Sequence, residues 1–329
     1  MTPRPTLTAV ARAAGVSPST ASRALRDDPR VADTTRSRVR HTAQRMGFRS
    51  NQVARALRLG GLTGLLGLVV PNLQDPFFTS VTTGVHAAAR AAGHQVIIGY
   101  HNEDPQAQQR LVEQMVAHRV SAVLIVPAPG TDPQPLAWEA DLGTWLVLID
   151  RPVPGLRCTT VTTDNVGGAS RLTEALLERG HRRLGVLTIE PSIWTQAERL
   201  AGVRTTLAQQ GLSLPEDRIV HGSAEVLRQR VRDLLTGPDA PTALLALSVP
   251  PLLSALLTGE LAGSKVELAS FDSHPLYGLL PVPVLCLEQD TDAIGRVAVD
   301  RALHPRPAGA EASVVLPLSP LQRRGGDHD

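Results

Sequence analysis

The chain has 329 residues, of which 42% are hydrophobic and 19% are charged. This balance is that of a globular protein of about two domains, and it excludes wholesale disorder. No apolar run approaches the ~18 residues of a membrane helix, and the N-terminus lacks the apolar core of a signal peptide, so we expect a cytoplasmic protein with no membrane partner. Cys158 and Cys286 are isolated in the sequence, which excludes a disulfide framework and a zinc site of the CxxC type.

The net charge of +2 conceals a strong asymmetry along the chain. Residues 1–61 hold twelve arginines and three acids, a balance of +9, so residues 62–329 carry −7. A solvated basic tail would lack periodic apolar residues, and this segment has them. The charge distribution therefore indicates a folded, polyanion-binding head attached to an acidic body.

The N-terminal segment is predicted to form three short helices. Apolar residues recur at helical spacing over residues 7–14, 18–25 and 34–46. A glycine can end the first helix, and Ser17 and Pro18 offer an N-cap and a favourable first position for the second. Three helices with a tight turn between the first two describe a helix-turn-helix unit.

The second of these helices can lie in the major groove of DNA. Ser19 and Arg23 share one face because they are four residues apart, and Arg23 can donate two hydrogen bonds to a guanine. Short polar side chains suit phosphate contacts. The alternative, an ordinary helical hairpin with solvated arginines, fits the cap, the spacing and the charge less well. The candidate DNA-binding residues of the head are Thr6, Ser17, Pro18, Ser19, Thr20, Ser22 and Arg23.

Residues 51–57 form a second candidate DNA-binding element, ahead of a flexible glycine pair. Asn51 begins the segment, and Ala54 and Leu57 lie on one face of a helix. An isolated helix of this length is marginal in water, so it would form only on a partner. A leucine inserted in the minor groove can kink DNA, whereas a plain linker is the alternative that spacing alone leaves open.

From Gly64 onward, apolar runs of strand length alternate with amphipathic segments, which predicts buried parallel sheets. Nine such runs suit two lobes, with a ligand in the cleft beyond the carboxyl ends of the strands. The polar segment 319–329 is expected to be frayed. The expected strands are residues 65–70, 95–100, 122–126, 145–149, 159–163, 184–189, 243–246, 266–271 and 284–287, and the expected helices are residues 80–92, 106–118, 168–179, 196–210 and 224–235.

The order of these elements resembles the LacI/GalR family of bacterial transcriptional repressors over nearly the whole chain. Residues 6–25 are similar to the helix-turn-helix signature of that family, and residues 51–57 are similar to its hinge helix, whose leucine opens a central base step of the operator. The resemblance implies an α/β protein: an all-α helix-turn-helix DNA-binding domain (1–50), a hinge helix and linker (51–61), and a two-lobed, periplasmic-binding-protein-like effector-binding and dimerisation domain with parallel sheets (62–329).

The same resemblance assigns ligand-contacting segments in the body. Residues 71–78 resemble the first ligand loop of the family, residues 149–151 the end of its fourth strand, and residues 199–202 its ligand-arginine segment. Residues 271–272 and 288–289 match later landmarks. The candidate effector-binding residues are Asp75, Phe77, Asp150, Trp194, Arg199, Ser248 and Asp272.

Each of these candidates also has a structural interpretation. Arg199 and Asp272 could grip a polyol or a base edge through charge-assisted bonds, or form a salt bridge across the lobes. Phe77 could stack on a sugar or fill the core. Asp150 could accept a ligand hydroxyl or cap a strand end, and Trp194 could line the pocket or lie outside it.

Several positions depart from the family pattern. Ser50 replaces the proline that usually precedes the hinge, Ser248 and Val249 stand where Asn-Asp is usual, and Ala224 replaces an aromatic lid residue. Trp194 stands where small polar residues are common. The effector therefore cannot be inferred from any relative.

We predict a sequence-specific repressor that binds a palindromic double-stranded DNA operator as a homodimer under the control of a small-molecule effector, with a sugar or sugar derivative ahead of a nucleobase. Effector binding would change the separation of the paired hinge segments. One alternative is the same regulator without small-molecule control, and a less favoured one is a sugar-binding or sugar-modifying protein. The sequence has no catalytic motif and no histidine cluster with metal spacing, so we expect no enzymatic activity, cofactor or metal.

Overall fold

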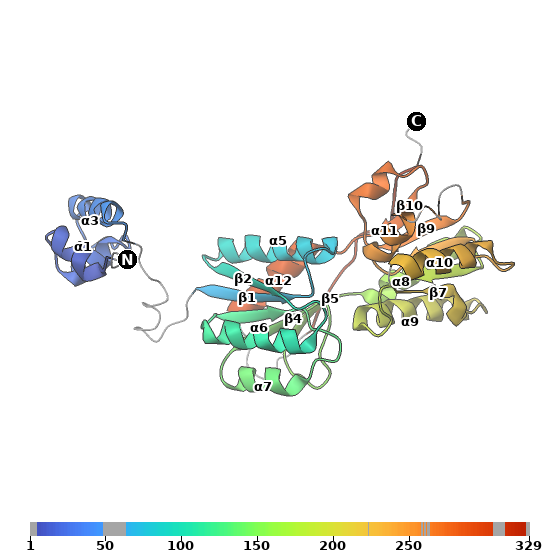
Figure 1. Cartoon of the computed structure of the whole chain (residues 1–329), viewed down its shortest axis with the longest axis horizontal. Coiled ribbons are helices and arrows are strands. Elements are labelled where there is room, and N and C mark those ends of the chain that lie inside the picture. The colour runs from blue at the N-terminus through green and yellow to red at the C-terminus, as the bar shows by residue number, and fades with distance from the viewer. Residues whose placement is uncertain are drawn as a thin grey trace. The chain divides into compact units, whose positions relative to one another are not determined.

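The computed structural model describes residues 5–48, 64–222, 224–257, 259, 261, 264–304 and 313–326. The chain divides into two compact units, Met1–Thr63 and Gly64–Asp329, which we call the head and the body (Figure 1). The head is all-α and the body is α/β, so the predicted fold class is confirmed. The predicted hinge, residues 51–61, lies outside the described residues.

The head consists of α1 Leu7–Ala13, α2 Pro18–Ala24 and α3 Asp33–Arg45, in agreement with the apolar spacing. A side chain caps each of the first two helices. The Thr6 hydroxyl accepts a hydrogen bond from the Ala9 amide at 3.2 Å, and the Ser17 hydroxyl accepts one from the Thr20 amide at 3.1 Å. The small core of the head contains Val10, Ala11, Ala14, Ala21, Ala24, Val31, Val39 and Ala43.

The turn between α1 and α2 needs a glycine. Gly15 has φ +65°, a left-handed conformation that other residues adopt at a cost. Its amide donates to the Arg12 carbonyl at 3.2 Å, and the next amide, that of Val16, donates to the Ala11 carbonyl at 3.0 Å. This Schellman arrangement satisfies the last carbonyls of α1. Only residues 14–17 therefore separate α1 from α2.

The body contains two six-stranded sheets, one in each of two lobes, with orders β11-β5-β4-β3-β1-β2 and β12-β10-β9-β8-β6-β7. Strand pairs in the described part of the body are parallel, apart from β12, which pairs antiparallel with β10. The strands are β1 Leu65–Val70, β2 Gln95–Tyr100, β3 Ala122–Ile125, β4 Trp145–Ile149, β5 Thr159–Thr163, β6 Leu184–Leu187, β7 Ile219–Val220, β8 Ala243–Ala246, β9 Glu267–Phe271, β10 Val284–Leu287, β11 Val314–Leu316 and β12 Gln322–Arg324.

Helices alternate with these strands and cover the sheets (Figure 1). They are α5 Pro76–Ala91, α6 Pro105–Ala117, α7 Pro133–Asp141, α8 Asn165–Glu178, α9 Trp194–Gln209, α10 Ala224–Thr236, α11 Val249–Leu257 and α12 Thr291–Leu303, with short 3-10 turns η1 Glu216–Arg218 and η2 Pro275–Leu279. The chain crosses between the lobes after β5, after β10 and after β11, because α12 packs on α5 in the first lobe and β12 joins the second sheet.

Helices in the first lobe begin earlier than the apolar spacing predicts. The expected starts were residues 80 and 106, whereas α5 begins at Pro76 and α6 begins at Pro105. Asp75, Asp104 and Asp132 each accept a hydrogen bond from the amide two residues later, at 2.8 to 2.9 Å. Each is followed by a proline at the first helical position. The repeated Asp-Pro pair is the signal that marks these starts and that reveals α7.

The expectation of a frayed segment at residues 319–329 is wrong for its central part. Residues Gln322–Arg324 form β12, which closes the second sheet against β10. Ion pairs hold the strand, since Arg323 donates to Glu267 at 3.0 Å and Arg324 donates to Glu288 at 3.1 Å. Edge pairing and these ion pairs order a polar segment that has no apolar periodicity.

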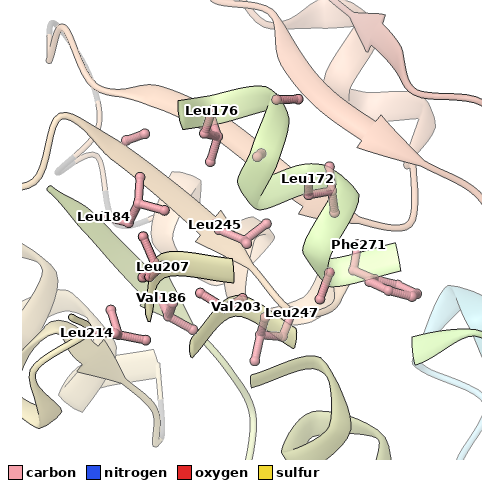
Figure 2. Packing of buried hydrophobic residues seen from close by; sticks show 14 of the residues in the cluster. Leu172, Leu176, Leu184, Val186, Val203, Leu207, Leu214, Leu245, Leu247 and Phe271 are labelled. Carbon is pink, nitrogen blue, oxygen red and sulfur yellow. The ribbon is translucent and has the colours of Figure 1, made fainter. Parts of the chain in front are cut away.

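Apolar side chains of α8 and α9 fill the core of the second lobe against its sheet. Figure 2 shows Leu172 and Leu176 of α8 packed near Val203 and Leu207 of α9 in this cluster. Phe271, the last residue of β9, belongs to the same cluster and is fully buried. The core therefore extends to the carboxyl end of β9, where the candidate effector residues begin.

Two glycines allow α5 and α12 to pack against each other in the first lobe. A methyl group added at Gly295 would lie 2.4 Å from backbone atoms of Gly84 and Val85. One added at Gly84 would lie 2.8 Å from the carbonyl oxygen of Thr291. Backbone atoms cannot move aside as a flexible side chain can, so this crossing excludes larger residues.

We expect Gly295→Ala to lower the free energy of unfolding of the body by about 1–3 kcal/mol, because it overpacks the contact between α5 and α12. Chemical denaturation of the full chain measures this effect. Gly278→Ala is the matched control, since a methyl group there has no neighbour within 4 Å. Equal stability of the two variants would contradict the close packing of these helices.

Candidate functional site

The carboxyl ends of strands from both sheets meet at a cavity between the two lobes of the body, as parallel-sheet topology predicts. Its volume is about 30 Å³, room for about two water molecules. Six of the seven predicted effector residues line it: Asp75, Phe77, Asp150, Arg199, Ser248 and Asp272. Its other lining residues are Phe78, Arg151, Ile189, Thr195, Gln196, Val249 and Gln289. Phe78, Arg151 and Gln289 lie in segments that the family resemblance marks, whereas Ile189, Thr195 and Gln196 lie outside them.

Trp194, the seventh predicted residue, does not line this cavity. It begins α9 and borders a separate hollow of about 310 Å³, together with residues such as Asp164 and Glu198. Thr195 and Gln196, the next residues of α9, line the cavity in its place, because each step along a helix turns the side chain by about 100°. The side chain of Ala224, at the predicted lid position, lies outside the described residues.

Arg199 is the buried cation at the centre of the site, with 3% of its surface exposed. Its Nε donates to Asn165 Oδ1 at 2.7 Å and its Nη1 donates to the Leu247 carbonyl at 2.6 Å. Its guanidinium carbon lies 3.7 Å from the centre of the Phe271 ring, a cation–π contact. Asp272 is bound elsewhere, since it accepts hydrogen bonds from the Gln289 amide at 3.1 Å and from Gln289 Nε2 at 2.7 Å.

Three carboxylates act electrostatically on Arg199, those of Asp272, Asp150 and Asp75. The pKa of Asp75 is raised to about 6, chiefly by burial and also by the charges of Asp272 and Asp150, against the opposing effects of the Phe77 amide and Arg199. Burial likewise raises the pKa of Asp272, although Arg199 and Gln289 oppose the shift. The cavity thus holds carboxylates whose ionised forms are poorly compensated.

Two of these carboxylates follow strands in a left-handed backbone conformation. Asp150, directly after β4, has φ +73°, and Asp272, directly after β9, has φ +78°. This conformation costs a residue with a β-carbon about 1–2 kcal/mol. Residues held in such conformations at strand ends cluster at functional sites, so the geometry points to a functional cleft.

Arg151 is a second buried guanidinium, in the segment 149–151 that the resemblance marks but not among the predicted effector residues. It donates to both carboxylate oxygens of Glu103, at 3.1 and 3.2 Å, and its Nε donates to Asp150 at 3.3 Å. Glu103 and the preceding Asn102 both have positive φ angles, of 60° and 50°. The tight turn after β2 therefore positions Glu103 against Arg151. These residues are 48 positions apart, so no local sequence signal links them.

Ser248 provides a hydroxyl to the cavity. Its residue is 8% exposed, and its Oγ has no hydrogen-bond partner in the described part of the chain. An unpaired buried polar group costs about 1–3 kcal/mol. Such a group at a cavity wall is available to a ligand.

The exposed face of α2 presents the predicted DNA-binding side chains. Pro18, Ser19 and Arg23 are exposed, whereas Ala21 and Ala24 are buried against the head core. The Ser17 hydroxyl already caps α2 and lies 2.8 Å from the Ser19 hydroxyl, so its capacity for a phosphate contact is reduced. Of the other predicted DNA-binding residues, Thr20 and Ser22 are half-buried and Thr6 caps α1, whereas Asn51, Ala54 and Leu57 lie outside the described residues.

Several arginines of the head are held by its acids. Arg30 pairs with Asp28 at 2.8 Å, Arg36 pairs with Asp33 at 2.8 Å, and Arg40 pairs with Asp27. Within residues 5–48, the side chains of Arg12, Arg23, Arg38 and Arg45 make no hydrogen bond or ion pair. Arg23 on α2 is therefore available for a contact with DNA.

Comparisons with known proteins agree with this geometry. Residues 6–51 match the bacterial regulatory proteins of the lacI family, and residues 66–272 match the periplasmic binding protein domain. The maltose regulon regulatory protein MalI of Escherichia coli is 32% identical over 310 residues, which cover 90% of each chain. The chain belongs to the LacI family of bacterial regulatory proteins. The predicted resemblance is confirmed.

Two further proteins place this LacI-family chain among regulators. The HTH-type transcriptional regulator GalR of Escherichia coli is 35% identical over 217 residues, which cover 65% of this chain and 62% of the length of GalR. The structure of a complex of the transcriptional regulator CelR with cellobiose aligns with a TM-score of 0.69 and 26% identity, over 98% of this chain and all of that one. These relatives are named as regulators.

Neither a metal site nor a membrane segment is found in the described parts of this LacI-family protein. No group of three or more histidine, cysteine, aspartate or glutamate side chains there is arranged to hold a metal ion. No described helix has the length and apolar character needed to cross a membrane.

We expect Asp75→Asn to stabilise the ligand-free protein, and to do so more at pH 7.5 than at pH 5. The pKa of this carboxyl is about 6 in the folded protein, above its ordinary value near 4. The folded state therefore binds the proton more tightly, and ionisation destabilises it progressively between pH 4 and 6. Asparagine retains the helix cap. The gain in unfolding free energy is expected to be about 1 kcal/mol larger at pH 7.5 than at pH 5.

The control is Asp132→Asn, which alters an exposed cap of the same type outside the cavity. Denaturation curves of both variants and the unaltered chain at the two pH values provide the comparison. A gain from Asp75→Asn that does not change with pH would contradict the raised pKa.

Proposed function

We propose that this LacI-family protein is a transcriptional repressor that binds a palindromic double-stranded DNA operator as a homodimer, controlled by a polyhydroxylated small molecule bound in the cleft of the body. The observation that carries the DNA-binding part is the exposed face of α2, where Arg23 is unpaired within the described head. A guanidinium on such a helix matches the acceptor pair of guanine in the major groove.

The chemistry of the cleft supports a ligand rich in hydroxyl groups. The carboxylates of Asp75, Asp150 and Asp272 can accept hydrogen bonds from hydroxyls, and the Ser248 hydroxyl lacks a partner. Phe77, which also lines the cavity, offers an apolar surface for a sugar ring. MalI is named for a maltose regulon and CelR was solved with cellobiose, which favours a sugar over a nucleobase.

A cavity of about 30 Å³ cannot hold a sugar, so the lobes must open to admit one. The three connections between the lobes, after β5, β10 and β11, can act as an interlobe hinge, which is distinct from the predicted hinge at residues 51–61. Gln289 spans it, because its side chain accepts from the Thr163 hydroxyl at 2.6 Å and donates to Asp272 at 2.7 Å. A ligand that binds one lobe arrangement better than the other shifts the population of the two, and this shift is the proposed signal to the head.

An exposed edge of the first sheet supports the homodimer. Strand β2 lies at that edge, and Ile98 and Tyr100 on it are 40% and 60% exposed. Apolar side chains on an open strand edge favour pairing with another surface. A second copy of the chain would also bring a second α2 to the other half of a palindromic operator.

Two alternatives remain as proposals. A regulator without small-molecule control is favoured by Ser248 and Val249, which give this wall of the cleft fewer polar groups than the family pattern. A sugar-binding or sugar-modifying protein would not need the basic head, and the relatives described above are regulators, not enzymes. We therefore propose no enzymatic activity for this chain.

We expect Arg23→Ala to weaken binding to the operator by about 1–3 kcal/mol and to relax base preference at one position in each half-site. The operator is first obtained by selection of binding sequences from random double-stranded DNA. Titrations of this site and of unselected DNA, at one fixed salt concentration, then measure the loss of specificity.

The charge-matched control is Arg30→Ala, since Arg30 is already paired with Asp28. It removes the same charge from the head. We expect it to weaken binding to selected and to unselected DNA by similar factors, each smaller than the effect of Arg23→Ala on the selected site. If Arg23→Ala also weakens binding to the selected and the unselected DNA equally, Arg23 contacts a phosphate and no base edge.

We expect Ser248→Ala to weaken effector binding about fivefold, because it removes one neutral hydrogen bond to the ligand. The stability of the ligand-free protein is expected to stay the same or rise, since the hydroxyl is buried without a partner. Calorimetry with galactose, maltose, cellobiose, fructose and ribose identifies the ligand and measures the effect.

Ser270→Ala is the matched control, because the Ser270 hydroxyl lies 3.1 Å from that of Tyr277 and does not line the cavity. It is expected to lower stability by about 1 kcal/mol without a change in effector affinity. An unchanged affinity in Ser248→Ala would remove Ser248 from the effector site.

A further inference from the structure

The positive and negative charges of the effector cleft do not sum to zero. Three carboxylates and two guanidinium groups line the cavity, and a fourth carboxylate, that of Glu103, pairs with Arg151 beside it, so the excess is two negative charges when all six groups are ionised. The carboxylates are those of Asp75, Glu103, Asp150 and Asp272, and the guanidinium groups are those of Arg151 and Arg199. A ligand entering this cleft therefore meets a negative electrostatic potential.

The two guanidinium groups have little capacity for an anion. All three nitrogens of Arg151 donate to the carboxylates of Glu103 and Asp150. Arg199 donates one N–H from Nε to Asn165 and one from Nη1 to Leu247. Bidentate recognition of a phosphate needs two free, parallel N–H groups on one guanidinium. In Arg151 each nitrogen already serves a carboxylate, and in Arg199 the fork that includes Nε is occupied by Asn165.

The helix N-termini at the cleft are also poor anion sites. The carboxylate of Asp75 already occupies the start of α5, where it accepts a hydrogen bond from the Phe77 amide at 2.9 Å. Helix α11 begins at Val249 and continues with Pro250 and Pro251, which have no N–H to donate. Helix α9, whose residues Thr195 and Gln196 line the cavity, begins without a side-chain cap. Its partial charge, about half a unit, is smaller than the excess of carboxylates.

We infer that the cleft selects an uncharged polyol and rejects the phosphorylated form of the same sugar, an inference that depends on the proposed effector role of the cleft. A phosphate adds a charge of about −1.5 to −2 at neutral pH. It would enter a region of the same sign, where the nitrogens of Arg151 and the Nε of Arg199 already serve protein acceptors. Sugar hydroxyls, in contrast, can donate to the carboxylates and accept from Ser248 and from Nη2 of Arg199.

Matched ligand pairs test this selectivity on the full chain. Each pair consists of a sugar and its phosphate: galactose and galactose 1-phosphate, fructose and fructose 1-phosphate, glucose and glucose 6-phosphate, ribose and ribose 5-phosphate. Calorimetry gives the two dissociation constants of each pair. For the sugar that binds, we expect the phosphate to bind at least about tenfold more weakly. A phosphate that binds more tightly than its parent sugar overturns the inference.

Asp75→Asn tests the electrostatic cause. The substitution removes one negative charge and retains a cap for α5. We expect it to shift the affinity ratio of sugar phosphate to sugar about tenfold toward the phosphate. Asp132→Asn, an exposed cap outside the cleft, is expected to leave the ratio unchanged. A ratio that is the same in Asp75→Asn and the unaltered chain overturns the inference.

Binding to the selected operator, measured in the same samples, separates failure of the inference from failure of the proposed function. If a sugar phosphate is the tighter ligand and changes DNA binding, the proposed regulator stands and the charge selectivity is wrong. If no member of any pair binds while the operator does, the effector role of the cleft is wrong, and the inference falls with it. Loss of operator binding itself contradicts the DNA-binding proposal.

Discussion

Much of the body depends on one constraint, the burial of the Arg199 charge beside the junction of the two lobes. Removing an ion from water costs several kcal/mol unless other groups replace its hydration. Asn165, the Leu247 carbonyl and the Phe271 ring supply part of that replacement from within the second lobe. The rest comes from carboxylates, and Asp150 belongs to the first lobe. The electrostatic environment of Arg199 therefore depends both on the relative position of the lobes and on what occupies the cleft.

The same constraint explains why the cleft can act as a switch. In the arrangement described here, carboxylates of both lobes lie near two guanidinium groups, and the pKa of Asp75 is raised chiefly by its burial and to a smaller extent by the charges of Asp272 and Asp150. Opening the lobes hydrates these groups but separates unlike charges. We propose that the hydroxyl groups of a ligand satisfy the carboxylates and the guanidinium groups better in one arrangement of the lobes than in the other. Gln289 is hydrogen-bonded to both Thr163 and Asp272. Movement at the interlobe hinge would therefore displace Asp272 relative to the first lobe.

Most of the fold could be predicted from the sequence, because buried parallel strands are nearly continuous apolar runs and their carboxyl ends must meet. The resemblance to the LacI/GalR family then assigned Asp75, Asp150 and Asp272 to one cleft at those ends, and all three line the cavity. Strand patterning does not reveal partners that are distant in sequence, so the pairing of Glu103 with Arg151 was missed. Trp194 was assigned to the cleft by its place in the chain, but a helix turns about 100° per residue and directs its neighbours there. Strand β12 was missed because ion pairs and edge pairing, and not apolar periodicity, order it.

We propose that the cleft of the body and the DNA-binding face of the head are coupled. Coupling between two binding sites is reciprocal in free energy. The most direct measurement is a full set of four dissociation constants: operator DNA with and without the bound sugar, and the sugar with and without operator DNA. The account predicts that the sugar changes the affinity for DNA, and that DNA changes the affinity for the sugar by the same factor. Equal DNA affinity in the presence and absence of a saturating sugar would contradict it.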